Sequence, residues 1–128
     1  MAVIFKSIAR KNPRDFQAAP KHYALVISNG SSDIDRLSRL VSDGSTVTNA
    51  DVYAVIVRLL HVIQEELSEG RIVKLGKLGD FRLSVNSFGV ETEEEVNASL
   101  IKKANIRYRP SKELNDMLKT LSYTKQSA

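Results

Sequence analysis

Residues 48–70 carry the strongest periodic pattern in the chain, and this pattern predicts a long amphipathic helix. Apolar side chains recur at i, i+3, i+4 and i+7 spacing. Val57 and Val62 lie outside that stripe, so the apolar surface is wider than a single packing contact requires. In so small a chain we expect a second copy to cover it. The expected dimer core comprises Val52, Val55, Ile56, Leu59, Leu60, Ile63 and, from the segment that follows, Phe81.

A glycine-rich hairpin is expected directly after this helix. Its predicted strands cover residues 72–75 and 80–85. Gly76 and Gly79 stand at the turn, where the backbone needs the positive φ that glycine adopts without strain. Apolar and polar residues alternate along the second strand, which predicts one buried face and one solvated face.

The remaining predicted elements are shorter. Segments 3–9 and 22–28 are rich in β-formers and are expected to pair with each other or with a sheet edge. A short helix is predicted between Ser32 and Gly44. Residues 104–109 alternate as a third strand with arginines on one face, and Pro110 opens a last helix that ends near residue 121.

Charge is segregated along the chain although the net charge is only +4. Residues 71–86 carry four basic and one acidic side chain, and residues 99–128 carry seven basic and two acidic ones. The long helical region is acidic by contrast. Basic strands on a small scaffold are typical of a surface that binds a polyanion, although ordinary surface charge without a partner gives the same composition.

Four motifs combine into a resemblance to a known family. They are Thr48-x-x-Asp51, Glu69-Gly70-x-x-Val73-x-Leu75, Leu78-Gly79-Asp80-Phe81 and Arg107-Tyr108-Arg109-Pro110-Ser111-Lys112-Glu113-Leu114. Their order and spacing resemble the bacterial histone-like HU and integration-host-factor proteins, over residues from about 32 to 121. Residues 1–30 lie outside that core and resemble the N-terminal extension of a longer HU-like branch.

The resemblance implies an α+β fold. Residues 31–121 would form an HU-like DNA-binding domain, with a helical dimer base and, in each subunit, a three-stranded antiparallel sheet and a β-arm. Residues 1–30 would add a two-strand β extension, and residues 122–128 a flexible tail.

The resemblance also implies a function. The chain is expected to act as a homodimeric, nucleoid-associated, architectural protein that binds duplex DNA and takes part in DNA condensation. Binding would depend mainly on phosphate contacts, with little sequence specificity. The expected DNA-binding residues are Lys74, Lys77, Arg82, Lys102, Lys103, Arg107, Arg109 and Lys112.

The arm departs from the family pattern. HU arms carry a basic-Asn-Pro tip, whereas residues 86–103 contain no proline and place Glu91 and Glu93–Glu95 where the tip is expected. These carboxylates would meet the phosphates with like charge, so we expect no insertion into the minor groove. The alternative function is an HU-fold protein-interaction module with weak or no DNA binding.

Other function classes find no support in the sequence. There is no nucleophile elbow, P-loop or dinucleotide fingerprint, so we expect no enzymatic activity, no small-molecule substrate and no cofactor. The chain has no cysteine, and its two histidines lack ligand partners, so no metal site is expected. No apolar run is long enough for a membrane span and no signal peptide is evident, which predicts a cytoplasmic, nucleoid location.

Overall fold

The computed structural model describes residues 2–127, which group into two compact units. The terminal unit comprises Met1–Asp33 and Met117–Ala128, and the central unit comprises Ile34–Asp116. The structure therefore differs from the expected division at residues 31 and 122. The last residues of the chain cluster with the N-terminal segment because they join its sheet.

Two helices form the helical part of the central unit. α1 spans Ile34–Asp43, and α2 spans Asn49–Ser68. Thr48 caps α2, because its Oγ1 accepts a hydrogen bond from the backbone N–H of Asp51 at 3.2 Å. This end bears out the Thr48-x-x-Asp51 pattern, and α1 packs against α2.

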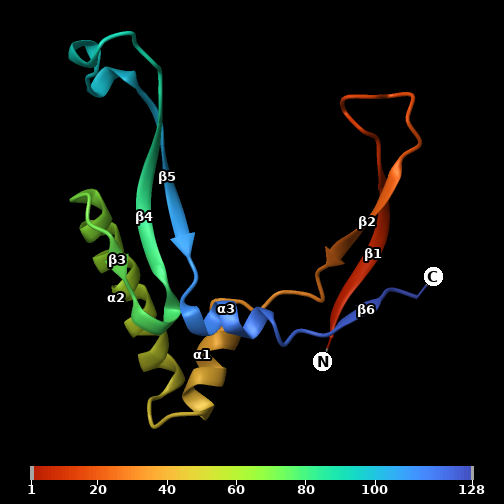
Figure 1. The fold of residues 1–128 in the computed structure, drawn as a ribbon. Helices are drawn as coiled ribbons and strands as arrows, with labels where there is room; N and C mark the ends of the chain where they lie inside the picture. The colour runs from red at the N-terminus through yellow and green to blue at the C-terminus, as the bar shows by residue number, and fades with distance from the viewer. Residues whose placement is uncertain (1, 128) are drawn as a thin grey trace. The chain divides into compact units, whose positions relative to one another are not determined.

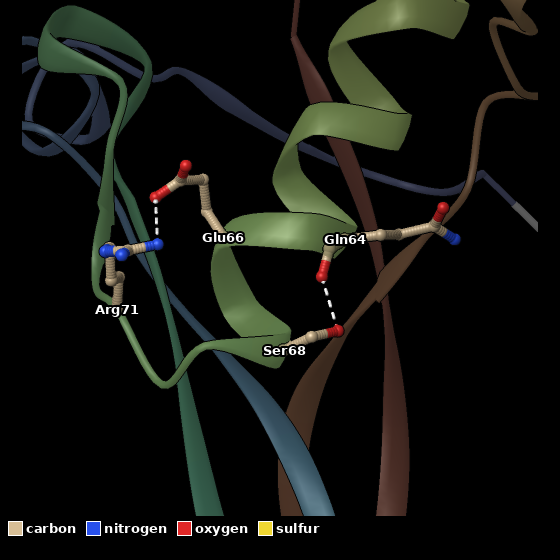
Figure 2. A network of polar contacts seen from close by, with 4 residues as sticks. All are labelled: Gln64, Glu66, Ser68 and Arg71. Atoms are coloured by element: carbon tan, nitrogen blue, oxygen red, sulfur yellow. Dashed lines mark hydrogen bonds and ion pairs between the residues drawn. The ribbon is translucent and has the colours of Figure 1, made fainter.

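The end of α2 turns directly into the sheet (Figure 2). Arg71 Nη1 lies 3.2 Å from Glu66 Oε2, and Ser68 Oγ donates to the backbone oxygen of Gln64 at 2.7 Å. Gly70 has a φ of +77°, which lets the chain leave the helix at this residue. The ion pair spans the turn between α2 and the first strand of the sheet.

The sheet of the central unit has the order β3-β4-β5, and both pairings are antiparallel. β3 covers Val73–Lys74, β4 covers Asp80–Ser87 and β5 covers Ile101–Arg109. A 3₁₀ turn, η1 (Gly76–Leu78), joins β3 to β4. The predicted hairpin and third strand are confirmed. β4 and β5 run further than expected and lie side by side up to the segment that holds η2 (Glu93–Glu95) and η3 (Ala98–Leu100) (Figure 1).

Gly79 is the residue on which the turn between β3 and β4 depends. Its φ is +112°, and a Cβ at this position would overlap the backbone oxygen of Arg109 and press against the Tyr108 ring. That ring is fixed in place, because the Tyr108 hydroxyl donates to the backbone oxygen of Leu78 at 2.6 Å. The ring also packs against Phe81 with centroids 5.2 Å apart. The glycine of the Leu-Gly-Asp-Phe motif therefore allows the start of β4 to lie close to the end of β5.

We expect Gly79→Ala to destabilise the protein by at least about 2 kcal/mol, because it adds both a strained φ and an overlap with backbone. Chemical denaturation followed by circular dichroism would measure the change. Gly89→Ala is the matched control, since nothing lies within 4 Å of a Cβ there and its φ is not in the positive region. Equal stability of the two variants would contradict this account of the turn.

The last helix, α3, covers Lys112–Leu118. Ser111 Oγ accepts from the backbone N–H of Leu114 at 3.2 Å and so caps its first turn. The helix ends earlier than the apolar pattern predicts, and Leu121 lies beyond it.

The terminal unit contains the second sheet, with the order β2-β1-β6. β1 (Val3–Arg10) pairs antiparallel with β2 (Lys21–Ile27), as expected for the N-terminal segments. The flexible tail expected from residue 122 is instead partly ordered, since β6 (Tyr123–Lys125) pairs parallel with β1. Hydrogen bonds from Val3 N to Ser122 O and from Gln126 N to Phe5 O, both 2.8 Å, satisfy backbone groups on the open edge of β1.

The single chain buries little of its apolar surface. Among the described residues, Val52 and Leu67 are the buried hydrophobic side chains. The accessible surface is 11056 Å², whereas a folded monomer of this mass exposes about 6,800 Å². Much apolar surface is thus left without a partner within one copy of the chain.

Candidate nucleic-acid interface

One face of the β3-β4-β5 sheet collects most of the cations predicted to bind DNA. Side chains alternate between the two faces of a strand, so residues paired in register share a face. Arg82 is the Cα partner of Arg107, Asp80 is the partner of both Lys74 and Arg109, and Asn86 is the partner of Lys103. We call this surface the basic face; its cations are Lys74, Arg82, Lys103, Arg107 and Arg109.

The charges of the basic face are poorly compensated within the chain. Arg82 and Arg107 lie directly opposite each other, an arrangement that is unfavourable for like charges. Among residues 2–127, no carboxylate lies within ion-pair distance of any of the five cations. Asp80 is the acidic residue in the paired rows of this face. The face therefore has a positive charge that an external anion can neutralise.

Two polar residues, Ser84 and Asn105, lie among the cations of the basic face. Arg107 Nε donates to Ser84 Oγ at 3.2 Å, which holds the guanidinium beside β4. Asn105, the Cα partner of Ser84, has a buried Nδ2 with no acceptor among the described residues. Asn105 Nδ2 is buried, so the donors that this face offers to phosphate oxygens are those of the cations. The alternation along β5 puts Asn105 on the same face as Arg107 and Arg109, and the strand register places it opposite Ser84.

Lys77, in η1, and Lys112, at the start of α3, lie beside the basic face. Lys112 and Arg109 line a depression of about 400 Å³ together with Asp80 and residues around the turn. Lys77 Nζ lies 3.4 Å from Glu113 Oε1, with both side chains well exposed. Lys77 is therefore partly neutralised by a neighbour, unlike the cations of the basic face.

Lys102 is separated from the other cations. The register of β4 and β5 shifts between Asn86 and Ser87, and Lys102 falls in the irregular step. Its Nζ lies 4.0 Å from the centroid of the Phe88 ring. Phe88 is itself exposed.

The acidic segment stands at the far end of the β4–β5 hairpin. Glu93–Glu95 form η2 and are exposed, and Thr92 Oγ1 donates to Glu95 Oε1 at 3.0 Å. No cation among the described residues pairs with these carboxylates. The structure thus leaves the acidic tip unneutralised, at a distance along the strands from the basic face.

The expected dimer core is distributed between buried and open positions in the single chain. Val52 is buried, whereas Val55 and Leu60 are 63% and 52% exposed. Residues of α1, of α2 and of the loop between them line an apolar depression of about 360 Å³, formed by Val41, Ser45, Val47, Val52, Val55 and Ile56. The remaining expected core residues, Ile56, Leu59, Ile63 and Phe81, are half-buried.

The sheet face opposite the basic face is also apolar and open. It carries Leu83, Val85, Ile106 and Tyr108, all more than two-fifths exposed. The alternation along β4 predicts that this face is buried, whereas Leu83 and Val85 are exposed within the single chain. Both the helices and this sheet face therefore present apolar surface that one chain does not cover.

Residues 2–127 contain neither a cluster of metal-ligating side chains nor a helix suited to cross a membrane. No group of three or more His, Cys, Asp or Glu side chains is placed to hold a metal ion. Within the same residues, no helix combines the length and apolarity that a membrane crossing requires.

Comparison with known proteins gives one family and one fold. A family model described as HU-HIG, an HU domain fused to a winged helix-turn-helix, Ig or glycine-rich motif, matches residues 1–125. A crystal structure from Bacteroides vulgatus, of a bacterial protein described provisionally as DNA-binding, superimposes with a TM-score of 0.64 at 17% identity. The match covers 96% of this chain and 48% of that one, so the chain spans about half the length of its neighbour. No curated protein matches the chain.

Proposed function

Because this chain belongs to the HU-HIG family, we propose that it is a non-catalytic protein that binds duplex DNA as a homodimer. Binding depends mainly on phosphate contacts and little on sequence, which makes the role architectural. The DNA-binding description of its structural neighbour supports the choice of partner. A nucleoid location and a part in DNA condensation follow from that partner.

The observation that carries the proposal is the Arg82–Arg107 pair. Two arginines directly opposite each other on adjacent strands repel, and no described carboxylate is close enough to relieve them. A phosphate bound between them would remove the repulsion and accept donors from both guanidinium groups. Lys103 and Arg109 extend the charge along the same face, in the direction of the strands.

The homodimer is supported by the uncovered apolar surface. The chain exposes about 4,000 Å² more than a folded monomer of its mass. In the central unit, exposed large apolar side chains lie on α1, on α2 and on the apolar face of the sheet. A second copy brings a matching apolar surface, as a two-fold symmetric interface requires.

A second candidate function is a protein-interaction module, which the exposed and unpaired Glu93–Glu95 favour. Under this alternative the acidic tip repels DNA and the chain binds a basic protein. The two functions predict different behaviour of one variant, in which these three glutamates are replaced by lysine.

We expect the wild-type chain to bind linear duplex DNA at low salt, with log Kd rising linearly with log salt concentration. Glu93→Lys, Glu94→Lys and Glu95→Lys combined should tighten that binding, because they replace repulsion of phosphate by attraction. Fluorescence anisotropy from about 50 to about 300 mM salt measures both effects.

Scrambled duplexes of equal length test sequence dependence in the same assay and should bind equally. A wild type that fails to bind at low salt, together with a lysine variant that binds, would identify the tip as a device that excludes DNA and would favour the protein-interaction module. Binding that does not change with salt would contradict the phosphate contacts.

A further inference from the structure

The loop joining β1 to β2 is a second strongly basic part of the chain. We call residues 10–21 the hairpin tip; its cations are Arg10, Lys11, Arg14 and Lys21, against the single carboxylate of Asp15. Arg10 and Lys21 are Cα partners at the end of the β1–β2 ladder. Two cations therefore face each other across the strands, as Arg82 and Arg107 do in the central unit.

The hairpin tip does not neutralise its own charge. No carboxylate among the described residues lies within ion-pair distance of its four cations. Asp15 Oδ1 instead accepts from the backbone N–H of Gln17 at 3.0 Å, and Asn12 Oδ1 accepts from that of Arg14 at 2.9 Å. These bonds shape the loop and leave the lysine and arginine groups available.

The cations border a depression in the terminal unit of about 460 Å³. Arg10, Lys11 and Lys21 line it together with Tyr23, and the Arg10 guanidinium carbon lies 6.0 Å from the centroid of that ring. Three cationic side chains therefore line one concave surface, with an aromatic ring at its side. Such a surface fits a phosphate group better than an apolar ligand.

Phe16 adds an apolar group to the same segment. It lies two residues after Arg14 and is 75% exposed, and it has no aromatic neighbour within ring-contact distance among the described residues. An exposed aromatic side chain among unpaired cations is a combination that serves contact with nucleic acid, where phosphates and base surfaces lie close together.

We propose that the hairpin tip is a second DNA-contact site, separate from the basic face. Arg10, Lys11 and Lys21 hold phosphate oxygens in the depression, Arg14 contributes a further phosphate contact, and Phe16 packs against the bases. Duplex DNA is the occupant because it offers both a dense row of phosphates and, in its grooves, adjacent base edges. This inference rests on the proposed DNA-binding function and assigns to it the residues of the extension.

The test is the salt dependence of DNA binding by full-length variants. Arg10→Gln, Lys11→Gln and Arg14→Gln combined should reduce the slope of log Kd against log salt by about 2 to 3 per chain, because each lost phosphate contact removes about 0.9. The matched control replaces three cations of the same unit away from the hairpin tip, Lys6→Gln, Lys119→Gln and Lys125→Gln. The control should retain the wild-type slope.

The outcomes separate this inference from the proposed function. A wild-type slope in the hairpin-tip variant, with a reduced slope after loss of Arg82 and Arg107, would overturn the second site and leave the proposed function standing. Equal losses in hairpin-tip and control variants would also overturn it, since net charge would then explain the effect. No DNA binding by the wild type would overturn both.

Two measurements keep the test independent of folding. Acylation of Lys11 and Lys21 in the wild-type protein should slow when duplex DNA is added; unchanged acylation would overturn the proposal. Phe16→Ala should weaken binding by about tenfold without changing the salt slope, because the lost contact is not electrostatic. Wild-type affinity of this variant would remove Phe16 from the site.

Discussion

Replacing Arg82 and Arg107 together by glutamine is expected to weaken binding of duplex DNA by about 100-fold at about 50 mM salt. Each lost phosphate contact removes one released counterion, so the slope of log Kd against log salt should also fall by about 1.8 per chain. The change should leave the fold intact or improve it, because it removes a repulsive cross-strand pair. Fluorescence anisotropy across salt measures the affinity and the slope. Thermal melting in parallel measures the stability of the fold.

The matched control for this experiment removes two cations elsewhere in the central unit. Arg39 and Arg58 lie exposed on α1 and α2, outside the sheet. Arg39→Gln with Arg58→Gln lowers the net charge by the same amount and should cost far less affinity. Similar losses in both variants would mean that overall charge, and not the basic face, determines binding.

Placing aspartate at both Val55 and Leu60 is expected to abolish the homodimer, with the dimer dissociation constant raised by at least about three orders of magnitude. Each substitution places a charge on the apolar surface that the second copy covers, and burying an unpaired carboxylate costs several kcal/mol. Neither side chain is buried within the single chain, so the effect would arise at the interface. Analytical ultracentrifugation of both forms measures the shift.

Val26→Asp with Val96→Asp is the control for the dimer experiment. These two side chains are 61% and 62% exposed; Val26 lies in β2 and Val96 directly follows η2, so neither belongs to α2. The control should remain dimeric.

The melting temperature of the wild type should also rise with protein concentration, because dissociation and unfolding are coupled in such dimers. A wild type that sediments as a monomer would remove the basis for this prediction.

Local patterns in the sequence predicted most of the secondary structure. The period of the apolar residues located α2, and Thr48 with Asp51 located its start, because a helix cap depends on neighbours three residues apart. Gly76 and Gly79 located the turn between β3 and β4, since glycine is needed where φ is positive. The alternation in 104–109 also predicted which residues of β5 share a face.

Contacts between distant segments could not be predicted in this way. β6 has three residues and no alternation to recognise, and its strand conformation depends on hydrogen bonds to β1 at the other end of the chain. The same holds for the early end of α3 at Leu118, because the chain passes into the terminal unit at Met117. No local pattern in residues 117–125 indicates that they pack with β1 and not with the central unit.

The sequence by itself determined that the basic residues alternate along strands and that the long helix has too much apolar surface for one chain. Only the tertiary structure decided which cations meet, because a shift of one residue in strand register moves a side chain to the opposite face. The register of β4 and β5 places Arg82 against Arg107 and separates Lys102 from them. The register of β1 and β2 likewise brings Arg10 and Lys21 together from the two ends of an eleven-residue step in the sequence.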